Sequence, residues 1–359
     1  VNADIADAVI RYAHATGDQE FEAGPGLDLL VNTARLWHSL GYHDAQGRFR
    51  IDGVTGPDEY SAVADNNVYT NLMARQNLRV AAESARRHRE LAHARLGVTE
   101  QEAASWLAAA DAMTVPYDQK LGVHPQAERF TEHQEWDFAA MTAADYPLLL
   151  HYPYFDLYRK QVVKQADLVL AMMLLPEEFT PEQKARNFAY YERLTVRDSS
   201  LSACCQAVIA AEVGQLDLAY DYLAESCLVD VDDRHTDTRS GLHIAALAGT
   251  WIAVVLGFGG MRRAGPVLCF APRLPAALRR LAFSLVEQGR VLRVEVGREQ
   301  ASYQLTAGTE PLPIRHFGQP VTVRPGEAQS CPIPALAPEP RPGQPPGREP
   351  ARRGPQEPS

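Results

Sequence analysis

The 359-residue sequence lacks the basic excess and the long apolar runs that mark two large classes of protein. Lys and Arg number 35 against 45 Asp and Glu, which gives a formal net charge of -10. Nucleic-acid binders gain much of their affinity by neutralising phosphates with basic residues, so this balance argues against nucleic acid as a partner. The longest apolar run, around Ile244–Leu256, is interrupted by Gly249 and Thr250 and is too short to span a bilayer. We therefore expect neither a nucleic-acid binder nor a membrane protein.

Cysteine is also scarce. An odd number that includes an adjacent pair makes a poor disulfide framework, and the spacing lacks the C-x-x-C pairs of a zinc site. The run Asp230–His235 does not match a calcium-binding loop, because the sixth place is not Gly and Gly241 stands where the bidentate Glu would be. The chain opens at Val1 without the basic and apolar regions of a secretory signal. We predict reduced thiols, no metal site and a cytoplasmic protein. The five cysteines are Cys204, Cys205, Cys227, Cys269 and Cys331.

Helical periodicity dominates the chain as far as about Gly260. Short turns between consecutive amphipathic stretches predict antiparallel helical hairpins, and the absence of a fixed repeat argues against a solenoid. The apolar positions of Ile5–Ala13 recur at helix spacing, and the same pattern predicts helices over Leu27–Ser39, Asn66–Arg87, Thr99–Thr114, Leu157–Leu175, Pro181–Leu194, Ser200–Val213, Leu216–Leu228 and Leu242–Val255.

The pattern changes after Gly260, where prolines become frequent. Short runs predict strands over Arg280–Leu285, Val291–Val296 and Ala301–Leu305, with Glu287–Gly289 as a hairpin turn between the first two. A small antiparallel β domain is therefore expected over residues 263–324. Residues 325–359 hold eleven of the 25 prolines and almost no large apolar side chain, so we predict a disordered Pro-rich tail.

The first segment suited to chemistry is Gly53–Tyr60, followed by Asp65–Asn71. The Gly-Pro turn inside it would present Asp58 and Glu59 on a rigid loop tip. A carboxyl group held there and covered by a sugar could have a raised pKa and act as a general acid. The alternative is a solvated acidic turn that caps the helix beginning near Asp65, and composition alone favours this plainer interpretation.

The second segment is Lys164-Gln165, which lies within the predicted helix Leu157–Leu175. A charged group and an amide flanked by apolar residues could point into a polar cavity. Lys164 and Asp167 also stand three residues apart, which on a helix would make an ordinary surface ion pair. Periodicity does not decide between these alternatives.

Two further segments lie at predicted helix starts. Arg197–Ser202 combines hydroxyl groups with the unpaired N–H groups of a first helical turn, which suits an anion, whereas a plain Asp or Ser cap is the alternative. Ser240–His243 precedes an apolar helix, and a capping or core histidine is the plainer interpretation there.

Together these segments resemble glycoside hydrolase family 65, the inverting disaccharide phosphorylases that act on maltose, trehalose, kojibiose or nigerose. The resemblance covers roughly residues 1–320. It implies a mainly α fold: a partial (α/α)6 barrel over residues 1–262, followed by the C-terminal β-sheet domain of residues 263–324, with the tail of residues 325–359 outside it. The residues that carry it are Thr55–Tyr60 with Asp65–Asn71, Lys164–Asp167, Asp198–Ser202, Gly241–His243, Gly249–Trp251 and Gly257–Gly260.

The resemblance also implies roles for individual residues. Glu59 matches the general acid of the family, and Lys164 and Gln165 match contacts to the transferred glucosyl unit. The phosphate-binding region is matched by Ser199, Ser200 and His243. The implied reaction is inverting phosphorolysis of an α-linked glucose disaccharide to β-glucose 1-phosphate and glucose. It needs no cofactor, uses inorganic phosphate as a co-substrate and is commonly carried out by homodimers.

The chain departs from the family in length, since members are about twice as long. A β-sandwich, a helical linker and the first barrel helices, with their Trp-and-acid motif for the non-reducing glucose, have no equivalent before Glu59. We therefore expect a C-terminal half that is inactive and poorly soluble by itself, because the Ile5–Ala13 stripe would lose its cover. An inverting, trehalase-like α-glucoside hydrolase of the same family and an inactive sugar-binding fragment remain the alternatives.

Overall fold

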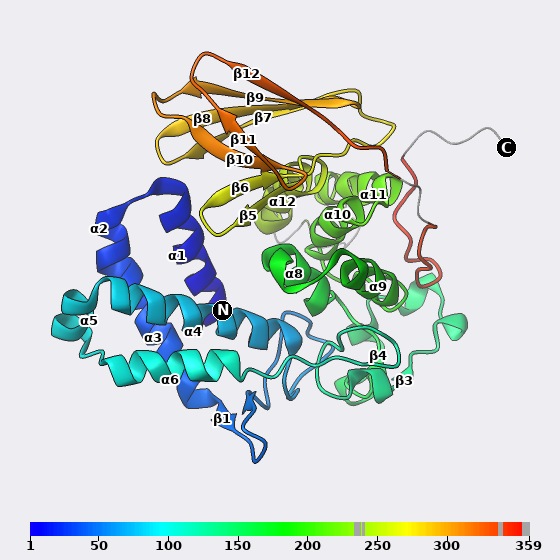
Figure 1. The fold of residues 1–359 in the computed structure, drawn as a ribbon. Coiled ribbons are helices and arrows are strands. Elements are labelled where there is room, and N and C mark those ends of the chain that lie inside the picture. Colours follow the sequence, from blue (N-terminus) through cyan, green and yellow to red (C-terminus); the bar gives the residue numbers. More distant parts are fainter. Residues whose placement is uncertain (233–237, 239–240, 337–339, 354–359) are drawn as a thin grey trace. The chain divides into compact units, whose positions relative to one another are not determined.

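The computed structural model describes residues 1–232, 238, 241–336 and 340–353. Two compact units divide the chain, residues 1–132 and residues 133–359 (Figure 1). The second half of the predicted Asp230–His235 loop, and Ser240, lie outside the described residues. Within the described part of the chain, no helix is both long and apolar enough to cross a membrane.

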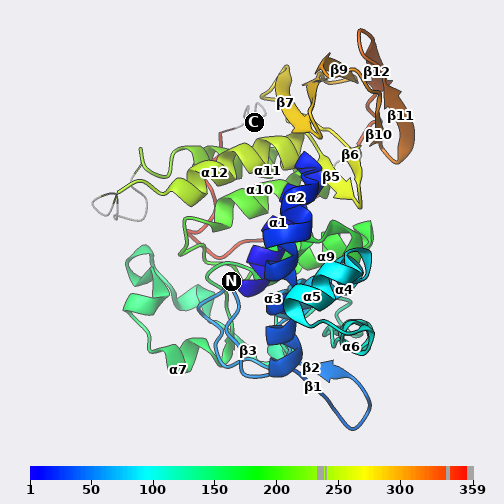
Figure 2. The ribbon, with the colours of Figure 1, turned by 90° about the vertical axis from the view of Figure 1, so that its left-hand side faces the viewer.

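The first unit is built around the long helix α4, Val68–Arg87, on which α1, α3 and α6 pack (Figure 2). Side-chain caps set two of the helix starts: Asn67 accepts the Thr70 N–H, and Thr99 accepts the Glu102 N–H. The remaining elements are α1 (Asn2–Thr16), α2 (Gln19–Phe21) with a π turn (Glu22–Gly26), α3 (Leu27–Leu40), β1 (Tyr42–His43), β2 (Phe49–Arg50), α5 (Arg89–Leu96), α6 (Glu100–Asp111) and a 3-10 turn (Phe130–Glu132).

The apolar stripe of α1 is mostly covered. Val9 and Ile10 are buried where α1 packs against α3 and α4, whereas Ile5 keeps an exposed fraction of 39%. The expectation that the Ile5–Ala13 stripe would lie open to water is therefore wrong. The reason is physical: periodicity identifies an apolar face but not which other segment covers it.

The second unit begins with short elements and continues with a group of helices in which α10 packs against α8, α11 and α12. The predicted capping box at Thr180 is confirmed, since Thr180 and Gln183 bond each other's backbone N–H groups. The elements are β3 (Gln134–Glu135), 3-10 turns (Phe138–Ala140, Ala143–Asp145, Leu148–Leu150 and Pro176–Glu178), α7 (Tyr154–Leu157), β4 (Lys160–Gln161), α8 (Asp167–Leu174), α9 (Pro181–Glu192), α10 (Ser202–Glu212), α11 (Leu216–Cys227), α12 (Ile244–Ile252) and a π segment (Ala253–Phe258).

One predicted helix, Leu157–Leu175, is wrong over its first half. The chain is extended there: β4 pairs in parallel with β3, and Val163 bonds the backbone of Leu194 and Val196. The β-branched pair Val162-Val163 suits such an extended segment better than a helix. Lys164 precedes α8, so Lys164 and Asp167 do not lie on one helix as that alternative requires.

After the helices come two four-stranded sheets, in the orders β11-β10-β6-β5 and β12-β9-β8-β7. Every pairing is antiparallel except that of β6 with β10. The predicted hairpin is confirmed: Gln288 and Gly289 form a two-residue loop with φ of 49° and 78°, which suits a type I′ turn. The strands are β5 (Met261–Ala264), β6 (Val267–Phe270), β7 (Leu281–Glu287), β8 (Arg290–Val296), β9 (Gln300–Ala307), β10 (Leu312–His316), β11 (Gln319–Val323) and β12 (Ala328–Pro332).

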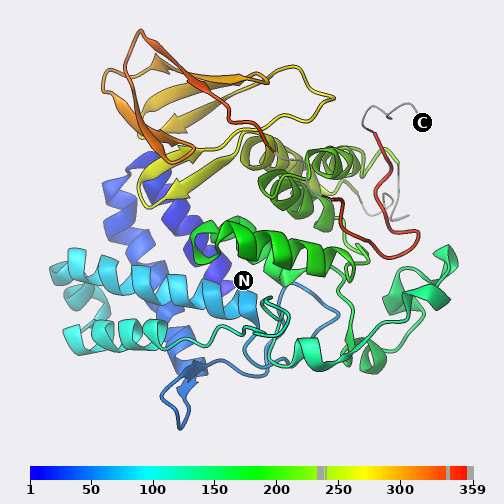
Figure 3. The same cartoon turned by 45° about the vertical axis from the view of Figure 1, so that its right-hand side comes forward.

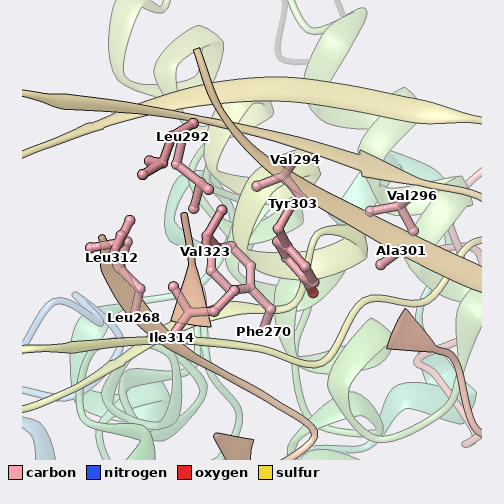
Figure 4. Close-up of a cluster of buried hydrophobic side chains, with 11 residues drawn as sticks. Leu268, Phe270, Leu292, Val294, Val296, Ala301, Tyr303, Leu312, Ile314 and Val323 are labelled. Carbon is pink, nitrogen blue, oxygen red and sulfur yellow. The ribbon is translucent and has the colours of Figure 1, made fainter. Parts of the chain in front are cut away.

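The inner faces of both sheets supply one apolar core (Figure 4). On β8, Leu292, Val294 and Val296 are buried and alternate with charged residues, as the strict alternation of the sequence predicts. Side chains from both sheets therefore hold this region together, including Phe270 and Ile314 from the first sheet.

Residues 325–336 and 340–353 of the Pro-rich tail are ordered, in contrast to the disorder predicted for the tail. Ala328–Pro332 forms the edge strand β12 beside β9, and residues 340–353 hydrogen-bond to helices of the second unit. Pro345 and Pro350 are buried. Proline narrows the conformations of the unfolded chain, so ordering such a segment costs less entropy than its scarcity of apolar residues suggests. Residues 337–339 and 354–359 lie outside the described residues.

Candidate functional site

Glu59 is exposed in the loop that joins β2 to α4, while the residues on both sides of it are buried. Asp58 and Tyr60 have exposed fractions of 0% and 1%. One carboxylate oxygen of Asp58 accepts the Tyr60 N–H at 3.2 Å, and the other accepts the side-chain amide of Gln126 at 2.7 Å. The backbone is therefore held on each side of a carboxyl group that faces solvent.

The rest of this acid loop, residues 51–67, is held by charged and amide groups. Asn66 lies in the left-handed region at φ 48°, which Asn tolerates better than most residues, and its amide donates to Glu128 at 2.8 Å. Glu128 also pairs with Arg50 at 2.5 Å, and this hydrogen bond lowers the pKa of the carboxyl group. Because Asn67 caps α4, the alternative in which the acidic turn serves as the helix cap is wrong.

Two of the predicted segments meet in the second unit. The Ser199 hydroxyl donates to the side-chain oxygen of Gln165 at 2.6 Å, and the Ser202 hydroxyl donates to the backbone oxygen of Lys164 at 3.2 Å. Lys164, Gln165, Ser199 and Ser200 are all partly exposed. The segment before α8 and the segment before α10 therefore form one polar surface at the N-terminal end of α10.

The two residues that precede the serines, Arg197 and Asp198, are held by charged partners. Arg197 is buried in the left-handed region at φ 54°, pairs with Glu225 at 3.2 Å and lies over the ring of Tyr222. The Asp198 side chain is 1% exposed, and it accepts the Leu148 N–H at 2.9 Å and pairs with Arg348 at 2.7 Å. Arg197 is thus engaged by a carboxylate.

His243 lies at the start of α12 and is held by a different loop. Its ring Nδ1 is 2.5 Å from a carboxylate oxygen of Asp230, and its backbone N–H donates to the same carboxylate at 3.1 Å. The bond to His243 lowers the pKa of Asp230. A carboxylate at Nδ1 fixes the orientation of the imidazole.

The predicted site residues are divided between the two units. Glu59 belongs to the first unit; Lys164, Gln165, Ser199, Ser200 and His243 belong to the second. No local pattern in the sequence points to Gln126 or Arg348, because both contact residues that are far away in the chain. Only knowledge of the folded contacts identifies them.

Two other features of the described residues are separate from these groups. No set of three His, Cys, Asp or Glu side chains in the described part of the chain is arranged to hold a metal ion. A groove of about 500 Å³ is present in the first unit, lined by residues of α4 to α6 that include Arg86, Arg89 and His93. None of the predicted site residues lines it.

Comparisons with known proteins agree with the resemblance. Residues 1–252 match the central catalytic domain of glycosyl hydrolase family 65, and residues 261–323 match the C-terminal domain of that family. An uncharacterized glycosyl hydrolase of Mycobacterium tuberculosis is 52% identical over 98% of this chain and 45% of its own length. An alpha,alpha-trehalose phosphorylase of Geobacillus stearothermophilus is 42% identical over 89% of this chain and 42% of its own length.

The fold is also found among solved structures. A putative kojibiose phosphorylase from the human microbiome superposes with a TM-score of 0.83 at 24% identity, over 92% of this chain and 46% of that one. The chain thus spans about half the length of the relatives it matches. Two family domains matched in order, over most of the sequence, leave one conclusion: this chain belongs to glycosyl hydrolase family 65.

Proposed function

We propose that this protein takes part in inverting phosphorolysis of an α-linked glucose disaccharide, giving β-glucose 1-phosphate and glucose. The observation that carries the proposal is the pair of hydroxyls, Ser199 and Ser200, at the N-terminal end of α10. The carboxylate beside them, Asp198, is buried and engaged by Arg348 and by the Leu148 N–H. Hydroxyl groups whose neighbouring carboxylate is buried and paired suit an anionic nucleophile better than a water that needs a base.

Glu59 is the proposed general acid. It would donate its proton to the glycosidic oxygen as the bond to the anomeric carbon breaks through an oxocarbenium-like transition state. Its exposed position between two buried neighbours supports this role, because the carboxyl group is open to a substrate while the backbone is fixed. A sugar that covers the carboxyl group would remove water from it and favour the protonated form.

The second unit supplies the proposed binding groups. Lys164 and Gln165 would contact the transferred glucosyl unit. Ser199, Ser200 and His243 would hold the phosphate, one oxygen of which attacks the anomeric carbon on the face opposite the leaving group. Support comes from the bond between Ser199 and Gln165, which joins the two sets of residues, and from Asp230, which holds the His243 ring in a fixed orientation.

The proposal concerns the whole protein as well as this chain. The partners would be the disaccharide and inorganic phosphate, with no cofactor, and the assembly would be a homodimer in the cytoplasm. The phosphorylases among the relatives act on trehalose, kojibiose or maltose by name, so each of these is a candidate substrate.

The experiment is a phosphorolysis assay on the 359-residue chain and on the longest form that its gene encodes. Maltose, trehalose, kojibiose and nigerose are each incubated with and without inorganic phosphate, and β-glucose 1-phosphate is identified by NMR of its anomeric proton. Phosphate-dependent release of that product is expected.

Two outcomes would contradict the proposal and support the alternatives. Glucose released equally without phosphate would favour the α-glucoside hydrolase, which fits the description of the Mycobacterium relative as a glycosyl hydrolase. A hydrolase would need a second carboxylate, about 6.5–9.5 Å from the acid, to activate water. Binding of a disaccharide without turnover in either form of the protein would favour the sugar-binding fragment.

A further inference from the structure

The C-terminal segment 340–353 runs beside the helices of the second unit (Figure 3). Polar contacts attach it to α9, to α11 and to the loop before α10. Arg341 pairs with Asp221 on α11 at 3.0 Å, and the Arg353 N–H donates to the same carboxylate at 2.7 Å. The side chain of Gln215 donates to the Pro340 oxygen at 2.8 Å. The segment is thus tied down at both of its ends.

Its middle enters a buried polar cluster. Glu192 of α9 is 1% exposed, and burial raises the pKa of its carboxyl group. Donors are supplied by Tyr222 at 2.6 Å and Gln206 at 2.5 Å, and the amide of Gln344 donates to Glu192 at 2.9 Å and also to the Tyr222 oxygen. A buried carboxyl group needs such donors, so Gln344 is part of the interior of the unit.

Arg348 connects the segment to the residues just before the serines. Its guanidinium donates to the Val196 oxygen and to the Asp198 carboxylate, the latter at 2.7 Å, and lies 4.5 Å from the ring centre of Tyr146. Between these two anchor points lies Arg197 in the left-handed region. A non-glycine residue keeps that conformation only where its surroundings hold it.

We propose that residues 340–353 form a strap that fixes the loop Val196–Leu201, and that Arg348 is a positioning residue for the phosphate nucleophile. The inference rests on the proposed function for its second half. Arg348 acts through the loop: by holding Val196 and Asp198 it sets where Ser199 and Ser200 stand before phosphate arrives. A loop fixed in its binding geometry loses less entropy on binding, and so binds more tightly.

The comparisons are compatible with a strap shared by part of the family. The alignment with the Mycobacterium tuberculosis relative leaves only 2% of this chain uncovered, which is fewer residues than the strap contains. That relative therefore aligns with at least part of the strap.

The strap is tested by hydrogen exchange on the 359-residue chain. Arg348→Ala is compared with Arg352→Ala, a control that removes the same kind of side chain from an exposed position in the same segment. We expect exchange of the amides of residues 197–201 to become roughly tenfold faster in Arg348→Ala, as the loss of a charged hydrogen bond would give, and to stay at the wild-type rate in the control. Unchanged exchange in Arg348→Ala would overturn the strap.

The positioning role is tested by steady-state kinetics in the active form of the protein. Arg348→Ala should raise KM for inorganic phosphate roughly tenfold and leave KM for the disaccharide, and kcat at saturating phosphate, within about twofold. Arg348→Lys keeps the charge but not the forked geometry, and should fold in case Arg348→Ala does not, with an intermediate phosphate KM. An equal rise of KM for both substrates would contradict positioning.

The failure of the strap can be told from the failure of the proposed function. If the wild-type protein releases no glucose 1-phosphate, the proposed function is wrong, and hydrogen exchange still decides whether Arg348 holds the loop. Calorimetric titration with inorganic phosphate then replaces the kinetics: weaker binding in Arg348→Ala than in Arg352→Ala supports positioning, and equal affinity overturns it.

Discussion

The two loops that carry the candidate groups are held in different ways. In the acid loop of the first unit, buried Asp58 and Tyr60 flank the exposed Glu59. The Asp58 carboxylate accepts a hydrogen bond from the Gln126 side chain, 68 positions along the chain. In the second unit, the loop before α10 has its carboxylate buried and its hydroxyls partly exposed, and Arg348 holds it from 150 positions away. The first arrangement exposes the carboxyl group that we propose as the proton donor; the second buries and pairs a carboxylate next to the proposed phosphate-binding hydroxyls.

The comparison shows two ways in which a loop can have a fixed backbone and also control whether its carboxyl group is exposed. In the acid loop, buried neighbours on both sides fix the backbone of the exposed Glu59. In the proposed phosphate-binding region, the carboxylates of Asp198 and Glu225 are each paired with an arginine, which offsets their negative charge.

The largest expected effect comes from removing the proton donor. Glu59→Gln should lower the rate on an unactivated disaccharide by roughly 10²–10⁴-fold, because an amide cannot protonate the leaving oxygen. A glucosyl fluoride, which needs little protonation, should recover part of that rate. Glu83→Gln, an exposed glutamate of the same unit, serves as the control and should leave the rate unchanged. A near-wild-type rate in Glu59→Gln would remove Glu59 from the mechanism.

The second effect tests the other loop. Ser199→Ala with Ser200→Ala, and separately His243→Ala, should raise KM for phosphate about 10- to 100-fold, as expected when hydrogen bonds to a charged group are lost, and raise KM for the disaccharide much less. Initial rates over a grid of both substrates measure the split. An equal rise of KM for both substrates would point to a structural role for these residues and would contradict a specific role of this loop in binding phosphate.

Removing the Asp58 carboxylate, which anchors the acid loop, should have a smaller effect, on both stability and kcat. Asp58→Ala leaves the Gln126 amide and the Tyr60 N–H buried without their acceptor, which costs about 1–3 kcal/mol of unfolding free energy. Urea unfolding measures the loss, and kcat should fall because Glu59 is no longer fixed. Asp111→Ala, whose exposed ion pair with Arg79 is worth about 0–1 kcal/mol, is the control. A kcat that is unchanged despite the lost stability would show that Glu59 needs no fixed backbone.

The smallest effect concerns pH. Arg50 lowers the pKa of Glu128 in the folded protein, so the stabilisation is complete above the unfolded pKa of about 4.3 and is lost as pH falls through the lower folded value. Because the Glu128 side chain is 40% exposed, the contribution should be below about 1 kcal/mol. Thermal melts between pH 6 and pH 3 should show a smaller acid destabilisation in Glu128→Gln than in the wild type. Identical pH profiles would mean that this pair does not stabilise the acid loop.

Much of the fold could be predicted because the deciding forces are local. The bounds predicted for the helix over 66–87 and the strand over 291–296 agree closely with those of α4 and β8. Both segments have a clear amphipathic period, 3.6 residues for the helix and 2 for the strand. The strands β10 and β11 escaped prediction because Pro313 and Pro320 interrupt their pattern. The predicted helix over 157–175 is wrong in its first half, where Val163 forms a parallel β-bridge with Thr195. Helical periodicity does not reveal a partner so far away in the chain.

For the candidate site, the sequence alone determined the chemistry that is available: a carboxyl on a Gly-Pro loop, hydroxyls before a helix, and the motifs that place the chain in its family. Only the tertiary structure decided which groups are open and which are engaged. Asp58 and Glu59 are adjacent acids, yet Asp58 is buried and hydrogen-bonded to Gln126, whereas Glu59 is exposed. Asp198 and the Pro-rich segment become partners across 150 positions. Such pairings depend on long-range burial and charge neutralisation, which the folded chain settles as a whole and no local pattern records.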